Sequence, residues 1–176
     1  LFGTGTGIQT DTSSGREVSL DPNYGWNDLL INTYKILIDI AKKNSNHNFI
    51  FKAKFASKFY LDLHKKMMNK EKLKNIKLIT SEKNYSLLKK SDLIISFGST
   101  TIVESLILNK SVLIPFYDEV RIKRYNNFIP FKELIDSKIA CRTKKIFSKK
   151  LEAFLQNKIK LNINNKFKKN FIIKYL

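Results

Sequence analysis

The part of the chain that most constrains its fold is the segment 91–115, which reads SDLIISFGSTTIVESLILNKSVLIP. Two short apolar runs, residues 93–97 and 111–114, flank a run with apolar residues at helical spacing, residues 100–109. A short apolar run is typical of a strand that is covered on both faces. Because parallel strands need a helical crossover between them, the segment predicts a βαβ unit.

The rest of the chain alternates in the same way. We expect strands and helices to alternate, with a flexible glycine-rich turn at residues 3–10, a long polar loop at residues 11–25 and an irregular segment at residues 121–135. The further predicted strands lie at residues 1–2, 49–51, 76–80 and 139–141, and the further helices at about 27–43, 57–73, 85–90 and 145–156. This alternation predicts an α/β fold, a doubly wound, Rossmann-like parallel sheet with helices on both faces.

We expect one domain over residues 1–157, which starts inside a strand and is truncated at its N-terminus, and a basic tail over residues 158–176. The chain of 176 residues is long enough for one full core. A hydrophobic fraction of 43% with 13 phenylalanines indicates a packed body rather than a disordered one.

The formal net charge of +18 raises the question of an anionic partner. Four of the 33 basic residues are arginine, so 29 are lysine, and the lysines are scattered over almost every segment. Because phosphate-reading surfaces favour the bidentate arginine fork, the pattern favours a solvated surface over nucleic-acid binding. Weak association with an anionic membrane surface stays open.

The sequence lacks the residue patterns that disulfide frameworks, metal sites, catalytic triads and membrane-spanning helices need. Cys141 is the only cysteine, which indicates a reducing compartment without a disulfide framework. His47 and His64 are isolated from each other, so no metal site and no Ser/His/Asp arrangement is expected. No apolar run reaches the ~18 residues that a spanning helix needs. We therefore expect a cytoplasmic protein, peripheral at most to the inner face of the cell membrane.

The candidate site lies where the first strand of the βαβ unit ends. Hydroxyls of Ser99, Thr100 and Thr101 meet the start of the following helix there, and such a helix start attracts phosphate. Glu104 would accept hydrogen bonds from ribose hydroxyls, as an acidic residue does in dinucleotide-binding folds. The alternative is a capping box between Thr101 and Glu104, with a structural role only. Asp118 and Glu119 follow the next strand and would serve either as a base or ribose contact or as solvated turn residues.

Two further groups of residues are expected near the same edge. Gly5 and Gly7 belong to a glycine-rich turn after the first strand, which forms either a flexible connector or a nest of N–H groups for phosphate. Lys52 and Lys54 end the next strand and share one face, either by chance or to contact the ligand.

The motif of residues 91–115 resembles the nucleotide-sugar-binding half of glycosyltransferase-B-type enzymes, in particular the surface-carbohydrate and capsule-polysaccharide biosynthesis proteins of bacteria. The lysine-bearing strand at residues 49–54 is similar to one that those proteins carry. The resemblance covers residues 49–119 well and residues 1–43 more loosely.

This resemblance implies a glycosyltransferase that takes a UDP- or CMP-linked sugar as its donor and has no permanently bound cofactor. The acceptor would be a glycan or a lipid-linked glycan. The catalytic base would belong to a missing N-terminal domain, so no catalytic residue is named. By position, the resemblance assigns the following residues to donor binding: Gly5, Gly7, Ser99, Thr100, Thr101 and Glu104.

Two alternatives remain on sequence alone. The first is a nucleotide-sugar 2-epimerase of the same fold, which would need acidic and histidine residues in a cleft between two domains. The second is a basic module that binds nucleic acid or a membrane surface, and it would show a steep salt dependence.

Overall fold

The structure of the protein is a computed structural model, which describes residues 2–4, 27–52, 65–66, 73–80, 83–123 and 129–175. Its strands are β1 (Phe2–Thr4), β2 (Phe49–Lys52), β3 (Ile76–Ile79), β4 (Leu93–Phe97), β5 (Ser111–Pro115) and β6 (Ala140–Cys141). Its α-helices are α1 (Asn27–Lys43), α3 (Asn84–Lys90), α4 (Thr101–Ile107), α5 (Lys144–Leu155) and α6 (Asn165–Tyr175). Short 3-10 helices at Asp118–Arg121 and Lys132–Leu134 lie between β5 and β6 in the part of the chain that the structure describes.

The six strands are all parallel and follow the order β3-β2-β1-β4-β5-β6. The chain therefore builds the sheet outward from β1 to β3, then returns to the other side of β1 with β4. This is the strand order of dinucleotide-binding sheets, so the α/β fold is compatible with a Rossmann-like one. The expected strands and the βαβ unit of residues 91–115 are confirmed.

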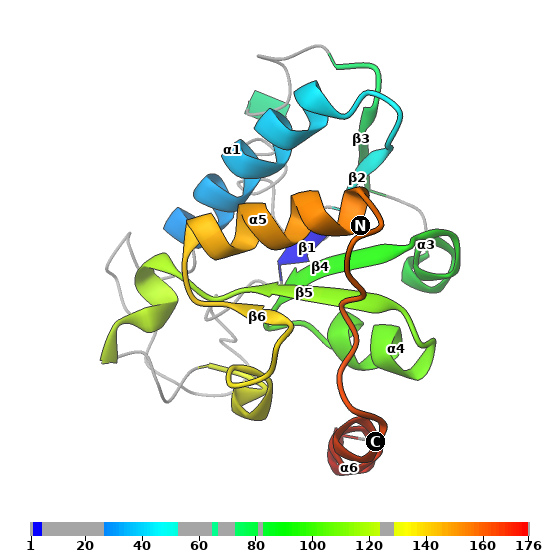
Figure 1. Cartoon of the computed structure of the whole chain (residues 1–176), viewed down its shortest axis with the longest axis vertical. Coiled ribbons are helices and arrows are strands. Elements are labelled where there is room, and N and C mark those ends of the chain that lie inside the picture. The colour runs from blue at the N-terminus through cyan, green and yellow to red at the C-terminus, as the bar shows by residue number, and fades with distance from the viewer. Residues whose placement is uncertain are drawn as a thin grey trace.

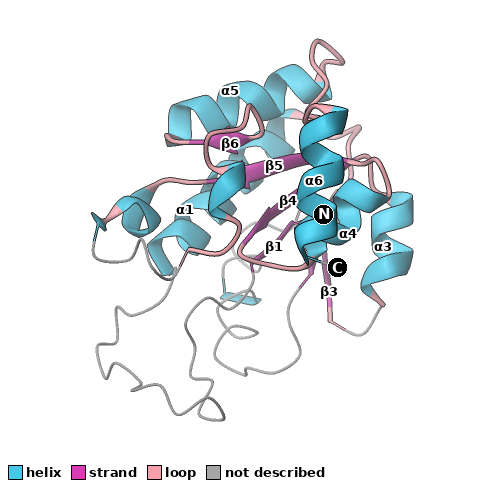
Figure 2. Cartoon of the chain, turned by 90° about the horizontal axis from the view of Figure 1, so that it is seen from below, coloured by secondary structure: helices cyan, strands magenta, loops and turns pink. Residues whose placement is uncertain are grey.

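Helices cover both faces of the sheet (Figures 1 and 2). Helices α1 and α5 lie on one face, and α3, α4 and α6 lie side by side on the other. Aromatic packing joins α1 to the sheet, since the ring of Tyr34 stacks on that of Phe51 with centroids 4.5 Å apart. All five residues of β4 are buried, as expected for a strand between two helical layers.

The βαβ unit is held to its neighbours by a side chain of its own motif. The Lys110 ammonium donates to the carbonyl of Lys89, 2.7 Å away in the last turn of α3. Because the carbonyls at a helix C-terminus lack partners within the helix, a cation there satisfies one of them. Lys110 thus has a structural partner.

The segment expected as a basic tail contributes to the core. The carbonyl of Leu161 accepts a hydrogen bond from the Val112 amide at 2.9 Å. Ile163 and Phe171 are buried in the same hydrophobic cluster as the sheet. Residues 158–175 therefore pack on the domain, with α6 against α4.

The rest of the secondary structure follows the expected boundaries to within a few residues, except for two segments. The predicted helix at residues 57–73 and the glycine-rich loop after β1 lie mostly outside the described residues.

Candidate functional site

The candidate site is at the carboxyl edge of the sheet, where β1 and β4 end side by side. Thr4 of β1 pairs with Phe97 of β4 in the parallel register. The chain turns toward β2 and β3 from β1, and toward β5 and β6 from β4, so strand order reverses between these two strands. In open α/β sheets, ligands bind in the crevice at such a reversal, beyond the carboxyl ends of the strands.

Gly98 forms the turn that leaves β4 at this point. Its φ of +64° lies in the left-handed region, which glycine enters without steric cost. A Cβ at this position would lie 3.0 Å from Cγ of Pro130. The turn therefore needs glycine for two reasons, its backbone conformation and the close approach of Pro130.

The hydroxyls after the turn bond to each other and to the helix start. The Ser99 hydroxyl oxygen accepts from the Thr101 amide at 3.3 Å and lies 3.0 Å from the Thr101 hydroxyl oxygen, to which it donates. The Ser99 carbonyl accepts from the Ile102 amide at 3.0 Å. Within the described residues, the amides of Ser99 and Thr100 have no hydrogen-bond acceptor. These two donors and the exposed Thr100 hydroxyl are available to a ligand.

The geometry of Glu104 differs from a capping box. The Glu104 amide donates to the Thr100 carbonyl at 3.1 Å, as in a continuing helix, and not to the Thr101 hydroxyl. Thr100 is the N-cap residue of α4 and makes no side-chain cap bond. In the described part of the chain, no hydrogen bond or ion pair engages the half-buried Glu104 carboxylate. Its oxygens therefore remain available as acceptors.

A buried hydroxyl lies one residue before the end of β4. Ser96 is fully buried, and its hydroxyl oxygen has no hydrogen-bond partner among the described residues. It pairs with Gly3 of β1 in the register. Unpartnered buried hydroxyls are few in native proteins and call for an explanation such as a functional role or a bound water molecule.

The remaining predicted site residues lie farther from this turn or outside the described residues. Lys52 ends β2, and its ammonium donates to the carbonyl of Thr80 beyond β3, at 2.9 Å. β1 separates β2 from β4, so Lys52 and the Ser99 turn are not on neighbouring strands. The predicted contacts of Gly5, Gly7 and Lys54 lie outside the described residues.

A second polar cluster at the same edge joins the end of β5 to α1. The Asp118 carboxylate accepts from Nδ2 of Asn32 at 2.7 Å and forms an ion pair with Lys144 at 2.9 Å. The hydroxyls of Thr33 and Tyr117 lie 2.7 Å apart, and burial raises the pKa of Tyr117 well above its ordinary value. Both Asp118 oxygens are thus engaged, which makes it a structural residue of this edge rather than a free base.

Sequence reasoning missed the partners of this cluster. Asn32 and Asp118 are 86 residues apart, and Thr33 and Tyr117 are 84 apart. A local pattern carries no signal for such a pairing. The one sequence signal for this cluster was Asp118 itself, an acidic residue shortly after a buried strand.

The described residues contain neither a candidate metal site nor a candidate membrane-spanning helix. No group of three or more histidine, cysteine, aspartate and glutamate side chains there could hold a metal ion. Within the same ranges, none of the helices combines the length and apolar character needed to cross a bilayer.

Comparisons of the chain with protein-family models, with curated proteins and with solved structures found no match.

Proposed function

We propose that this chain is the donor-binding domain of a glycosyltransferase-B-type enzyme, which transfers a sugar from a nucleotide-sugar to a surface polysaccharide or a lipid-linked glycan. The observation that carries the proposal is the position of the turn at Gly98 to Thr101. It leaves the sheet where strand order reverses, beside the end of β1. A nucleotide is the typical ligand of that place in a parallel α/β sheet.

The groups around the turn have the chemistry of a nucleotide-sugar site. The amides of Ser99 and Thr100, with the Thr100 hydroxyl, would donate to phosphate oxygens. The carboxylate of Glu104 lies one helical turn farther along α4 and would accept from ribose hydroxyls. A carboxylate one helical turn from these donors would repel a bare phosphate. The donors and the carboxylate together therefore favour a ligand that carries both a phosphate and a sugar.

The proposal is tested by calorimetric titration of the chain with UDP, CMP and GDP. We expect one of them to bind, and Glu104→Gln to weaken that binding roughly tenfold, which corresponds to about one charge-assisted hydrogen bond. Inorganic phosphate would bind more weakly than the nucleotide because it makes no ribose contact.

The matched control is Glu152→Gln, the same chemical change at an exposed position of α5. It removes one negative charge far along the chain from the turn and should leave the affinity unchanged. If none of the three nucleotides binds, or if both variants weaken binding equally, the proposal fails.

A further inference from the structure

Ile173 of α6 is the most exposed large hydrophobic residue in the part of the chain that the structure describes, at 67% exposure. Single apolar side chains are common on protein surfaces, so exposure alone indicates no function. The position of Ile173 on its helix and the charges beside it distinguish it from such residues.

Contacts with the domain fix which side of α6 points outward. Phe171 is buried, and its ring packs edge-on against that of Phe131 with centroids 5.7 Å apart. The Lys168 ammonium donates to the side-chain oxygen of Asn109, which follows α4. Residues three, four and seven apart share one side of a helix. The side opposite Phe171, called the outward face of α6 below, carries these exposed residues: Lys166, Lys169, Asn170 and Ile173.

The charge of α6 has one sign. The helix contains four lysines and neither aspartate nor glutamate. Glu133 lies beside the end of the helix, where its carboxylate accepts from the Lys174 ammonium and, at 3.0 Å, from the Tyr175 hydroxyl. The outward face therefore presents positive charge around an isoleucine, and the acid beside the helix end is already paired.

Helix α5 provides a comparison, because it lies on the other face of the sheet and also contains four lysines (Figure 1). Its exposed side carries Lys145, Lys149 and, one turn farther along, Glu152. An acid thus stands on α5 where α6 has Ile173. An anionic layer would favour the outward face of α6, since this face adds an apolar contact and lacks the repulsion.

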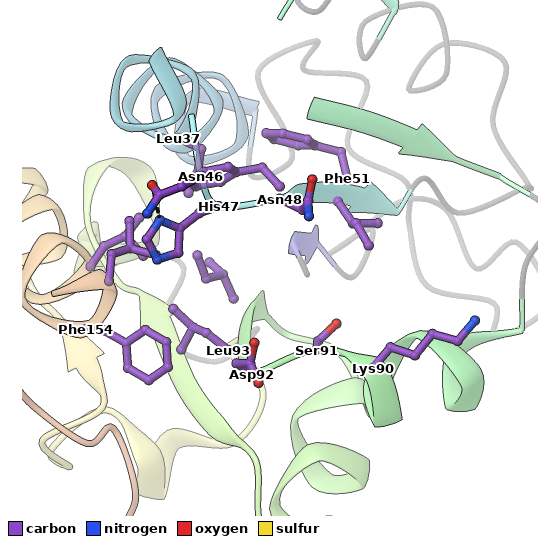
Figure 3. A pocket seen from close by; sticks show the side chains of 15 residues that line it. Leu37, Asn46, His47, Asn48, Phe51, Lys90, Ser91, Asp92, Leu93 and Phe154 are labelled. Carbon is purple, nitrogen blue, oxygen red and sulfur yellow. Dashed lines mark hydrogen bonds between the residues drawn. The ribbon is translucent and has the colours of Figure 1, made fainter. Parts of the chain in front are cut away.

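Two hollows of the surface fit an anionic partner less well. The hollow at the amino edge of the sheet, about 380 Å³ in volume, is lined by the exposed side chains of Asn46, Asn48 and Asp92 (Figure 3). A hollow of about 530 Å³ beside the start of α6 is lined by Glu133 and Asp136. Carboxylates at both places would repel an anion, so the outward face of α6 is the better docking surface.

We propose that the outward face of α6 docks on the surface of an anionic phospholipid bilayer, with Ile173 at the boundary between headgroups and acyl chains. Lys166 and Lys169 keep their ammonium groups at the level of the phosphates, while their methylene stems lie along the apolar layer. One isoleucine is too little to hold the protein when salt screens the lysines, so binding stays salt-dependent. This inference is independent of the proposed function.

Nucleic acid fits the same face less well than a bilayer does. A phosphate backbone offers no apolar partner to the aliphatic side chain of Ile173. Helix α6 also has no arginine, the residue whose planar fork suits phosphate recognition best.

The first test removes lysines from the two helices separately. Lys166→Gln with Lys169→Gln on α6, and Lys145→Gln with Lys149→Gln on α5, each remove two positive charges at exposed positions. Titration with vesicles of phosphatidylcholine and phosphatidylserine measures the partition coefficient. We expect the α6 pair to lower it roughly tenfold and the α5 pair less than about twofold, because a lysine contributes only near the anionic surface.

The second test locates Ile173 directly. Cys141 is buried, so a polarity-sensitive dye attaches selectively to Ile173→Cys or, in a matched chain, to Ile146→Cys at a 41% exposed position of α5. With the same vesicles, we expect the emission of the dye at position 173 to shift to shorter wavelength, and that of the dye at position 146 to stay unchanged.

Three results would overturn the proposal. The first is failure of the unaltered chain to bind these vesicles. The second is an equal effect of the two lysine pairs, or an equal shift of the two dyes, which would mean that diffuse charge acts without a preferred face. The third is tighter binding to single-stranded RNA than to vesicles at the same concentration of phosphate groups, which would assign the face to nucleic acid.

Discussion

At the scale of single residues, Gly98 is the position where the candidate site is most sensitive to backbone geometry. We expect Gly98→Ala to lower the free energy of unfolding by about 1–3 kcal/mol, because alanine at φ +64° is strained and its Cβ would press on Pro130. Urea denaturation measures the change.

Two further variants separate the two causes. Gly98→Ala combined with Pro130→Ala should recover the part of the loss that comes from the contact. Gly98→Asn should lower the free energy of unfolding by less than the larger size of its side chain suggests, because asparagine adopts a left-handed backbone more readily than most residues. If Pro130→Ala recovers nothing, the close approach has no energetic weight.

Burial of Cys141 and Tyr117 makes a prediction about alkaline pH. Burial raises the pKa of the Cys141 thiol to about 11 from its ordinary value near 9, and it raises the pKa of the Tyr117 hydroxyl as well. The folded chain therefore holds these protons at a pH where the unfolded chain has released them. The contribution of the Cys141 thiol to the free energy of unfolding is therefore fully present below pH 9 and is lost as pH rises through 11.

We expect the free energy of unfolding to fall between pH 9 and pH 11, and to fall less steeply in Cys141→Ala. Urea denaturation at several pH values gives both slopes, and lysine titration affects the two proteins alike. Equal slopes would show that the thiol is not protected in the folded chain.

At the scale of elements, α6 offers a test of how firmly the C-terminal segment belongs to the domain. Phe171 is buried, and its ring packs against Phe131 at 5.7 Å and Phe167 at 6.3 Å between centroids. We expect Phe171→Ala to cost about 3 kcal/mol of unfolding free energy, as is usual for a phenylalanine removed from a core.

The matched control lies two residues along the same helix. Ile173 is 67% exposed, so Ile173→Ala should change stability by less than about 0.5 kcal/mol. Chemical denaturation of both variants decides the matter. A small effect at both positions would mean that α6 is a loosely attached tail after all.

At the scale of the whole molecule, the net charge of +18 determines how the protein meets charged surfaces. We expect it to sediment with vesicles that contain anionic phosphatidylserine at 0.05 M salt and to be released at about 0.5 M, because screening shortens the range of these forces to a few ångströms. Neutral phosphatidylcholine vesicles should not carry it down at either salt concentration. Binding that resists 0.5 M salt would require apolar insertion rather than diffuse charge.

The fold was more predictable than the site, and the reason lies in the range of the interactions. Residues 91–115 carry their strand, turn and helix signals within 25 consecutive positions, so the βαβ unit could be read locally. The C-terminal segment could not be predicted in this way, because its many lysines mask the apolar periodicity of α6. Its packing on the domain is seen only in its contacts with α4 and β5.

The site shows the same division in single residues. Gly98 and the hydroxyls after it were recognisable as a turn, but the capping box and a free carboxylate at Glu104 could not be told apart until the helix start was placed on Thr101. Asp118 was visible as an acid after a strand, whereas its engagement by Asn32 and Lys144 depends on how α1, β5 and α5 come together.

By itself, the order of residues determined most of the strands and helices up to residue 157, since a local periodicity among neighbouring residues encodes each of them. Only the tertiary structure decided which strands are adjacent, that β4 lies beside β1 across the reversal, and that the C-terminal segment packs on α4 and β5. The physical reason is that pairing and packing join residues far apart in the chain, and no local pattern records their partners.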